Sequence, residues 1–269
     1  MIEFRDVTYA HENGVVALAG VSVSIGAGET VAIVGENGAG KTTLVRHVTG
    51  LLKPKQGAVL VDGVDTRHTT VASLSRKIGV AFQNPDHQLF SESVKEEMAF
   101  ALRNFGFPAE LVEQRVAWGL RLFGLEEYRD SSPLVLSGGE KKRLTLACIL
   151  SWDPEVVILD EPTVGQDAIQ KEKLAGTIKM LASAGKTVVV VSHDIEFLWP
   201  LQSRVVVMKS GRIVADGPAA DIMQRREVLE PARVAEPQLV SFYRELRHRP
   251  AAPFVDPLGA RLWVEEGRT

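Results

Sequence analysis

The chain has one cysteine, no long apolar run and no surplus of basic residues, and each of these absences excludes a class of protein. Its single cysteine, Cys148, rules out an intrachain disulfide and is typical of a reducing compartment. No apolar stretch approaches the ~20 residues that a transmembrane helix needs. We therefore expect other chains to cross the bilayer if this protein serves a membrane process. The first residues, MIEFRDVTYA, lack the basic start and apolar core of a signal peptide, so we expect none.

The composition is that of a globular protein with a substantial core. Hydrophobic residues make up 45% of the 269 positions, which suits a soluble α/β protein. The formal net charge of −3 argues against a nucleic-acid partner, because nucleic-acid-binding proteins usually carry a basic surplus. Cys148 lies in the apolar stretch LTLACIL, where we expect it to pack in the core.

Short apolar segments alternate with helical patterns along most of the chain. Residues 2–9 and 17–25 alternate apolar and polar side chains around a turn, which predicts an N-terminal antiparallel hairpin. Continuous apolar runs predict strands buried on both faces, and they lie in VAIV (31–34), IGVAFQ (78–83), VVILDEP (156–162) and TVVVVSHD (187–194). Strands that alternate with helices imply an α/β fold with a doubly wound parallel sheet.

Two regions differ from this alternation. Residues 93–150 are helical by apolar spacing, and we interpret them as an α-helical insertion. After Gly217, proline becomes frequent, with six of the 13 prolines between Pro218 and Pro257. We therefore divide the chain into a main domain, residues 1–217, and a small C-terminal extension, residues 218–269. Within the extension, PQLVSFYRELRHR predicts one short helix, and we expect the rest to be irregular.

The segment GENGAGKTT, residues 35–43, has the spacing of a phosphate-binding loop between a buried strand and a helix. Its glycines let several backbone N–H groups face one anion, and the helix N-terminus adds positive potential. Lys41 would hold the β- and γ-phosphates of ATP, and the Thr42 hydroxyl would ligate Mg²⁺. We assign nucleotide binding to the whole segment: Gly35, Glu36, Asn37, Gly38, Ala39, Gly40, Lys41, Thr42 and Thr43.

Polar side chains end three of the predicted parallel strands, at the edge where such sheets bind ligands. Asp160 would hold Mg²⁺ with Thr42, and Glu161 would polarise the attacking water as a general base. Gln83 can reach both metal and water, and His193 can contact the γ-phosphate. The alternatives are an acidic pair that faces solvent and a structural histidine. We assign catalysis to Glu161, His193 and Gln83, and metal binding to Thr42, Gln83 and Asp160.

These segments, together with LSGGE at 136–140 and Asp167, resemble the ATP-binding-cassette (ABC) ATPases, in the order in which that family has them. The resemblance covers about residues 1–217, and LSGGE after an α-helical insertion is its most specific part. The fold it implies is the P-loop NTPase ABC nucleotide-binding domain. That fold has a RecA-like parallel-sheet core, an N-terminal antiparallel β-subdomain and an α-helical insertion.

The resemblance also implies that two subunits close head to tail over ATP. Ser137, Gly138 and Gly139 would contact the γ-phosphate held by the partner subunit, since they open a helix and offer N–H groups to an anion. Glu140 belongs to the same nucleotide-binding motif and replaces a common glutamine.

Two further site residues come from the resemblance alone. Tyr9 is similar to the aromatic residue that stacks on adenine, with an ordinary strand tyrosine as the alternative. Asp167 would lie at the dimer contact between the two sites. The family usually has Ser-x-Leu-Asp there, whereas this chain has Val-Gly-Gln-Asp at 164–167, which makes communication between the sites through this loop less secure.

A narrower resemblance is to the ATPase subunits of energy-coupling factor (ECF) transporters, which import vitamins, cobalt and nickel. It is carried by FQNPDHQLFSESVKEEMAFAL, by LSGGEKKRLTLA and by the proline-containing extension. It implies a second ATPase subunit, a substrate-binding membrane subunit and a transmembrane coupling subunit that docks near Gln83 to Glu92. The protein would then lie peripherally on the cytoplasmic face of the cell membrane. We expect Lys141, Lys142 and Arg143 to form a solvated helix face, with a partner patch as the alternative.

Other functions remain open at this point. The chain could energise another ABC importer or an exporter. ABC proteins of translation or DNA repair usually carry two cassettes or a long coiled-coil insertion, and this chain has one motif set. A small-molecule P-loop kinase would leave LSGGE and His193 without a role.

Overall fold

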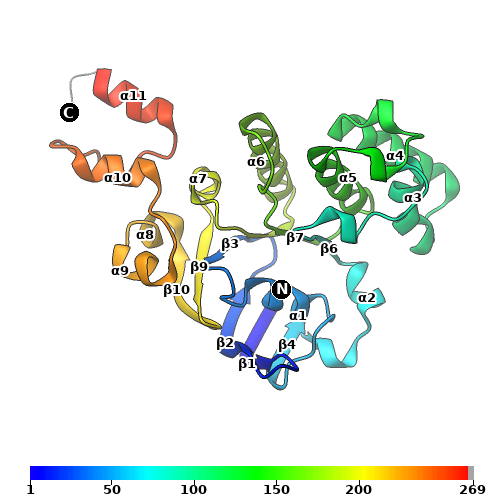
Figure 1. The fold of residues 1–269 in the computed structure, drawn as a ribbon, viewed down its shortest axis with the longest axis horizontal. Coiled ribbons are helices and arrows are strands. Elements are labelled where there is room, and N and C mark those ends of the chain that lie inside the picture. The colour runs from blue at the N-terminus through cyan, green and yellow to red at the C-terminus, as the bar shows by residue number, and fades with distance from the viewer. Residues whose placement is uncertain (266–269) are drawn as a thin grey trace.

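The computed structural model describes residues 1–265 and is built on two β-sheets (Figure 1). The larger sheet has the strand order β10-β9-β3-β8-β7-β6. Its strands are β3 (Thr30–Gly35), β6 (Ile78–Ala81), β7 (Val156–Asp160), β8 (Thr187–Val191), β9 (Arg204–Lys209) and β10 (Arg212–Pro218). The strands from β9 to β6 are parallel, and β10 pairs antiparallel with β9 at one edge. The predicted parallel core is therefore confirmed.

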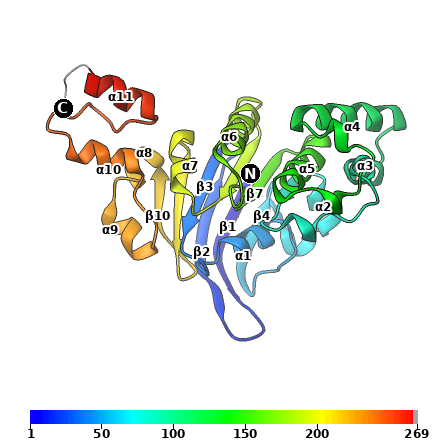
Figure 2. The same ribbon diagram turned by 45° about the horizontal axis from the view of Figure 1, so that its top comes forward.

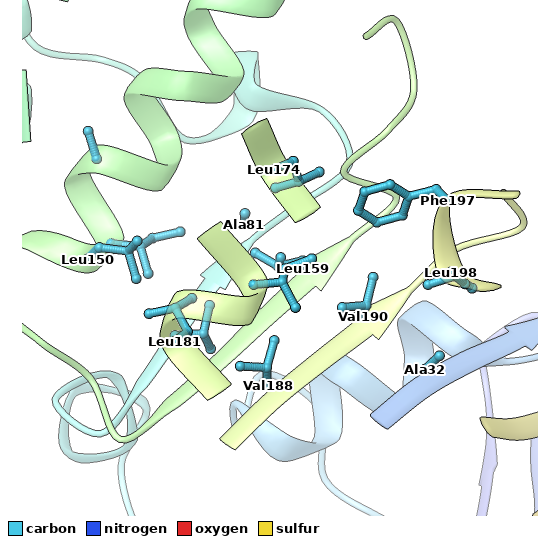
Figure 3. Close-up of a cluster of buried hydrophobic side chains, with 14 of the residues drawn as sticks. Ala32, Ala81, Leu150, Leu159, Leu174, Leu181, Val188, Val190, Phe197 and Leu198 are labelled. Atoms are coloured by element: carbon cyan, nitrogen blue, oxygen red, sulfur yellow. The ribbon is translucent and has the colours of Figure 1, made fainter. Parts of the chain in front are cut away.

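The continuous apolar runs have a direct physical cause. Neighbouring side chains of a strand point to opposite faces, so a sheet that is covered on both sides needs apolar residues at every position. In β8, Val188 and Val190 lie on the face of the sheet that Leu174 and Leu181 of α6 (Ala168–Ser183) cover, as Figure 3 shows. Val189 and Val191 belong to the core on the opposite face. Burying each such side chain contributes roughly 1.5–3 kcal/mol.

The opposite face is covered by α1 (Lys41–Val48) and by the second sheet, which has the order β2-β1-β4-β5. Its strands are antiparallel: β1 (Ile2–Ala10), β2 (Val16–Ile25), β4 (Gln56–Val61) and β5 (Val64–Asp65). The N-terminal hairpin is confirmed. The expectation of a doubly wound sheet is corrected in part, because a sheet shares this face with α1.

The α-helical insertion lies at one end of the molecule, away from the C-terminal extension (Figures 1 and 2). Its helices are α3 (Val94–Asn104), α4 (Ala109–Phe123) and α5 (Gly138–Ser151). Ser93 caps α3 by accepting a hydrogen bond from the Glu96 N–H, and Pro108 precedes α4. The helical character expected of this region is confirmed.

The C-terminal extension contains α8 (Ala219–Ile222), α9 (Arg226–Leu229), α10 (Gln238–Glu245) and α11 (Pro257–Glu265). The expectation of an irregular end is wrong for α11, which begins at a proline, a favoured first helical residue. Ile222, Leu229 and Val240 are buried in the same core as the helix-covered face of the large sheet. The extension is thus packed onto the main domain. In residues 1–265, no helix is both long and apolar enough to span a bilayer.

Candidate nucleotide-binding and catalytic site

The loop between β3 and α1 is closed by glycines that no other residue could replace. Gly35 has φ of 150°, and a Cβ there would lie 2.2 Å from the Met208 carbonyl oxygen. Gly40 has φ of 103°, and its Cβ would lie 2.3 Å from the Ala17 carbonyl oxygen. Only glycine combines a left-handed backbone with so close an approach. The loop therefore wraps tightly at the N-terminus of α1.

Lys41, the first residue of α1, lies inside this loop. Its Nζ donates to the carbonyl oxygens of Gly35 at 2.8 Å and Glu36 at 3.0 Å. The residue is 7% exposed, and burial lowers the pKa of its amine, while the carboxylates of Glu161 and Asp160 act in the opposite direction. A buried ammonium bonded only to carbonyls is well placed to receive an anion.

Thr42 and Asp160 bring α1 to the end of β7. The Thr42 hydroxyl donates to Asp160 Oδ2 at 2.9 Å. Asp160 is 2% exposed, and burial raises the pKa of its carboxyl group. Its other oxygen, Oδ1, is buried and has no hydrogen-bond partner among the described residues. Such an oxygen beside a hydroxyl fits Mg²⁺, which prefers oxygen ligands. Thr42, Gln83 and Asp160 also line one cavity of about 490 Å³.

Glu161 follows β7 in an unusual backbone conformation. Its φ is 50°, which costs of order 1–3 kcal/mol for a residue other than glycine. Its N–H donates to the Val191 carbonyl oxygen at 2.7 Å, which ties the turn to the next strand. The side chain is turned toward His193, whose Nδ1 lies 2.8 Å from Glu161 Oε2. Because a carboxylate can only accept, this contact fixes the hydrogen on Nδ1.

The phosphate loop and the ends of three strands share one cavity of about 520 Å³. Its lining includes Lys41, Thr42, Gln83, Glu161 and His193. These residues come from four separate parts of the sequence. The structure thus brings the sequence-predicted phosphate, metal and catalytic groups together.

The signature segment LSGGE lies apart from that cavity. Ser137 caps α5, and Glu140 completes a capping box, since Glu140 Oε2 accepts from the Ser137 N–H at 2.7 Å. Ser137 and Gly138 are exposed. Asp167 caps α6 by accepting from the Gln170 N–H at 2.8 Å, and it also lies outside the lining of the cavity. Within one subunit, the N-termini of α5 and α6 therefore do not line the phosphate cavity.

Comparison with known proteins identifies this arrangement. Residues 18–164 match the family model described as ABC transporter. The chain belongs to the ABC transporter family. As a member of this family it is an ATP hydrolase. It is 41% identical over 249 residues to the energy-coupling factor transporter ATP-binding protein EcfA of Methanothermobacter thermautotrophicus, with 92% of this chain and 80% of that protein covered.

Solved structures agree with the ABC assignment. The chain is similar to cbiO1 of Clostridium perfringens, described as part of the ABC transporter complex cbiONQ. That match has a TM-score of 0.75 and 33% identity, and covers 90% of this chain and 97% of the other. A dimeric ATP-binding cassette bound to ADP and Pi matches with a TM-score of 0.74 and 29% identity, covering 81% and 98%.

The sequence did not predict that the turn after β1 lines the phosphate cavity. His11 lines the 520 Å³ cavity, together with Val15 and Val16, whereas Tyr9 does not. The Tyr9 ring packs edge-on against the rings of His11 and His47, with centroids 5.2 and 4.8 Å away. The aromatic residue on the strand thus supports the ring in the following turn. No sequence pattern places the turn HENG, residues 11–14, beside the phosphate loop, so only the fold reveals this proximity.

The segment from Gln83 to Glu92, which we name the docking segment, is held by side chains. Gln88 accepts from the Phe82 N–H and donates to the Val80 carbonyl oxygen, both at 2.9 Å. Glu97 Oε2 accepts from the N–H groups of Phe90 and Ser91 at 2.8 and 2.7 Å. Beside this segment lies a largely apolar cavity of about 320 Å³ between the large sheet and α5.

Proposed function

We propose that this chain is the ATPase subunit of an ECF-type transporter that imports a vitamin or a transition-metal ion. It would work from the cytoplasmic face of the cell membrane as a peripheral subunit. The observation that supports this best is that, within one subunit, the phosphate cavity is separate from the exposed signature turn at Ser137 and Gly138. A site divided in this way needs two copies to be complete. The similarity to EcfA and to cbiO1 supports the ECF class.

In this proposal the phosphate loop, residues 35–43, holds the phosphates of ATP. Lys41 exchanges its bonds to the loop carbonyls for the β- and γ-phosphates, and the helix N-terminus adds positive potential. We place adenine beside His11, which replaces Tyr9 in that role because it lines the cavity. A heteroaromatic ring can stack on a base much as a phenol can.

The reaction in our proposal is phosphoryl transfer to water. Glu161 accepts a proton from the attacking water, His193 holds the Glu161 carboxylate and contacts the γ-phosphate, and Gln83 helps to orient the water. Mg²⁺, held by Thr42, Asp160 and Gln83, would neutralise charge on the phosphates when bound. A general base of this kind typically contributes ~10²–10⁴ in rate.

The partner subunit completes the site. Ser137, Gly138 and Gly139 would direct N–H groups and a hydroxyl at the γ-phosphate, and the Glu140 capping box would hold that turn in shape. Asp167 would lie where the two subunits meet. The second subunit is either identical or a relative, and ATP binding across the contact would draw the pair together.

The closing of the two ATPase subunits over ATP would be transmitted to membrane subunits. We propose that a transmembrane coupling subunit docks on the docking segment and the apolar cavity beside it, and that a substrate-binding membrane subunit completes the transporter. ATPases of other ABC importers and of exporters are the alternative. Purification of the tagged chain from membranes would decide: co-purified ECF-type subunits support the proposal, whereas ribosomes, DNA or subunits of another transporter class would refute it.

The divided site has a sharper test. A chain with Ser137→Arg keeps its phosphate loop, and a chain with Lys41→Ala keeps its signature turn. Mixing the two inactive variants creates heterodimers with one intact site, and random pairing restores roughly a quarter of the wild-type activity. Mixing each variant with itself is the matched control. A mixture no more active than its parents would count against a site shared by two copies of this chain.

A further inference from the structure

Two consecutive lysines near the start of α5 reach in different directions. Lys141 Nζ donates to Asp86 Oδ1 at 2.7 Å, in the docking segment. Lys142 Nζ donates to backbone carbonyls of the loop that carries Glu161. The expectation that both lysines belong to a solvated helix face is therefore wrong. Figures 1 and 2 place α5 beside the strands β6 and β7, after which these two segments begin.

The ammonium group of Lys142 is hydrogen-bonded to the loop after β7. Its Nζ lies 3.4 Å from the carbonyl oxygens of Glu161 and Pro162, and it also donates to the Val164 carbonyl oxygen. An ammonium group has three donors and no acceptor, so three carbonyls can occupy all of its hydrogens. Among residues 1–265 no carboxylate forms an ion pair with Lys142. Burial lowers the pKa of this amine, and attraction by Glu161 acts against that shift.

The backbone of this loop determines where the Glu161 side chain points. Its φ of 50° is held on the amide side by the hydrogen bond to the Val191 carbonyl. On the carbonyl side, the peptide oxygen of Glu161 accepts from Lys142 Nζ and from the Val164 N–H, each at 3.4 Å. Loss of the ammonium would remove the contacts of Lys142 with the carbonyl oxygens of residues 161, 162 and 164. Glu161 would then be less well directed toward His193.

Lys141 links the same turn of α5 to the docking segment. Its side chain is mostly buried, at 16% exposure, whereas that of Asp86 is 56% exposed. Asp86 lies in the short 3₁₀ turn Pro85–His87, which packs against α5. An ion pair with one exposed partner is weak and easily exchanged. A protein that binds the docking segment can therefore change this contact without unfolding the turn.

We propose that Lys141 and Lys142 are positioning residues that couple the docking segment to the orientation of Glu161. When a partner displaces Asp86, the ion pair with Lys141 changes and the N-terminal turn of α5 shifts. This shift alters the hydrogen bond from Lys142 to the Glu161 carbonyl oxygen. The coupling runs through adjacent residues of one helix turn. The inference rests on the proposed function, since it assumes that Glu161 activates water and that a partner binds the docking segment.

Lys142 is tested in the full chain by steady-state ATP hydrolysis. We expect Lys142→Gln to lower kcat about tenfold and to leave KM for ATP within about twofold, because the loop and not the nucleotide is affected. Lys142→Arg keeps a cation and restores most of kcat. Lys179→Gln, which removes an exposed cation from α6, is the matched control. If Lys142→Gln does not fold, the arginine variant decides alone, and a tenfold loss of its kcat overturns the proposal.

Two further results of this experiment contradict the role of Lys142: wild-type kcat in Lys142→Gln, or a loss expressed only in KM. Failure of the wild-type chain to hydrolyse ATP would contradict the proposed function instead. The two failures are thus distinguishable.

Lys141 is tested by charge reversal in the transporter complex purified with its membrane subunits. Asp86→Lys and Lys141→Asp each remove the ion pair, and the double variant rebuilds it in the opposite direction. We expect each single variant to lower ATP hydrolysis about threefold or more, and the double variant to recover most of it. Single variants as active as wild type, or a double variant no better than the worse single one, would overturn the coupling.

Discussion

The Glu161 carboxylate lies 2.8 Å from Nδ1 of His193, although 32 residues separate them in the chain. The contact joins the ends of β7 and β8, which are adjacent parallel strands. Glu161 is buried, whereas His193 is exposed, so the pair runs from the interior of the protein into the nucleotide cavity that both residues line. We interpret the Glu161–His193 pair as a base held ready for the attacking water.

Glu161→Gln should abolish turnover while leaving ATP binding intact. The amide keeps the shape of the side chain but cannot accept the proton, so kcat should fall by ~10²–10⁴. Because hydrolysis would reopen the pair, the variant should accumulate as an ATP-dependent dimer, measured by size-exclusion chromatography with light scattering. Glu155→Gln, at the other end of β7, is the control. Turnover close to that of the wild type would remove Glu161 from its proposed role.

His11→Ala should weaken ATP binding through loss of the ring beside the base. Stacking is worth ~1–3 kcal/mol per base, so KM for ATP should rise about tenfold with little change in kcat. His11→Trp should retain tight binding. His68→Ala, an exposed histidine outside the cavity lining, should have no effect. An unchanged KM in His11→Ala would show that a residue other than His11 contacts adenine.

Asp160→Asn should stabilise the nucleotide-free protein and inactivate it. Burial raises the pKa of the Asp160 carboxyl, so the folded state binds more protons than the unfolded state between the two pKa values. Stability therefore falls as pH rises through that window, and the deficit persists at neutral pH. The amide can still accept from Thr42, so removal of the charge should add about 1–3 kcal/mol.

Thermal melting measures that effect. The difference between Asp160→Asn and wild type should shrink as the pH is lowered toward acid, where the native carboxyl is protonated. Mg²⁺ with ATP should stabilise the wild type more than the variant. A variant less stable than the wild type at neutral pH would contradict this account of the buried carboxyl.

Deletion of residues 219–269 should unfold or aggregate the chain. The extension buries Ile222, Leu229 and Val240 against the main core, and each such side chain contributes roughly 1.5–3 kcal/mol. Deletion of 250–269 alone removes α11, the Phe254 carbonyl that accepts from Trp199 Nε1 at 2.7 Å and the Phe254 ring beside Phe242, and it should cost much less. Urea unfolding of both forms would show this. Equal stability of the longer deletion and the full chain would mean that the extension folds independently.

The sequence by itself determined the nucleotide chemistry and the parallel sheet. The phosphate loop is local, because its glycines, Lys41 and Thr42 follow one another and need only a strand before them and a helix after them. Buried strands can also be predicted from the sequence, since a sheet covered on both faces needs apolar residues in succession. Asp160, Glu161 and His193 could be placed together because parallel strands end at a common edge.

Only the tertiary structure decided which neighbours the remaining side chains meet. His11 lies in a turn, and its position over the phosphate loop depends on how β1 and β2 pack against α1. Lys141 and Lys142 are consecutive on a helix, so their directions differ by about 100°, and their partners Asp86 and Val164 are distant in sequence. In the extension only PQLVSFYRELRHR predicted a helix, and the helices there are stabilised by contacts with a core built elsewhere in the chain.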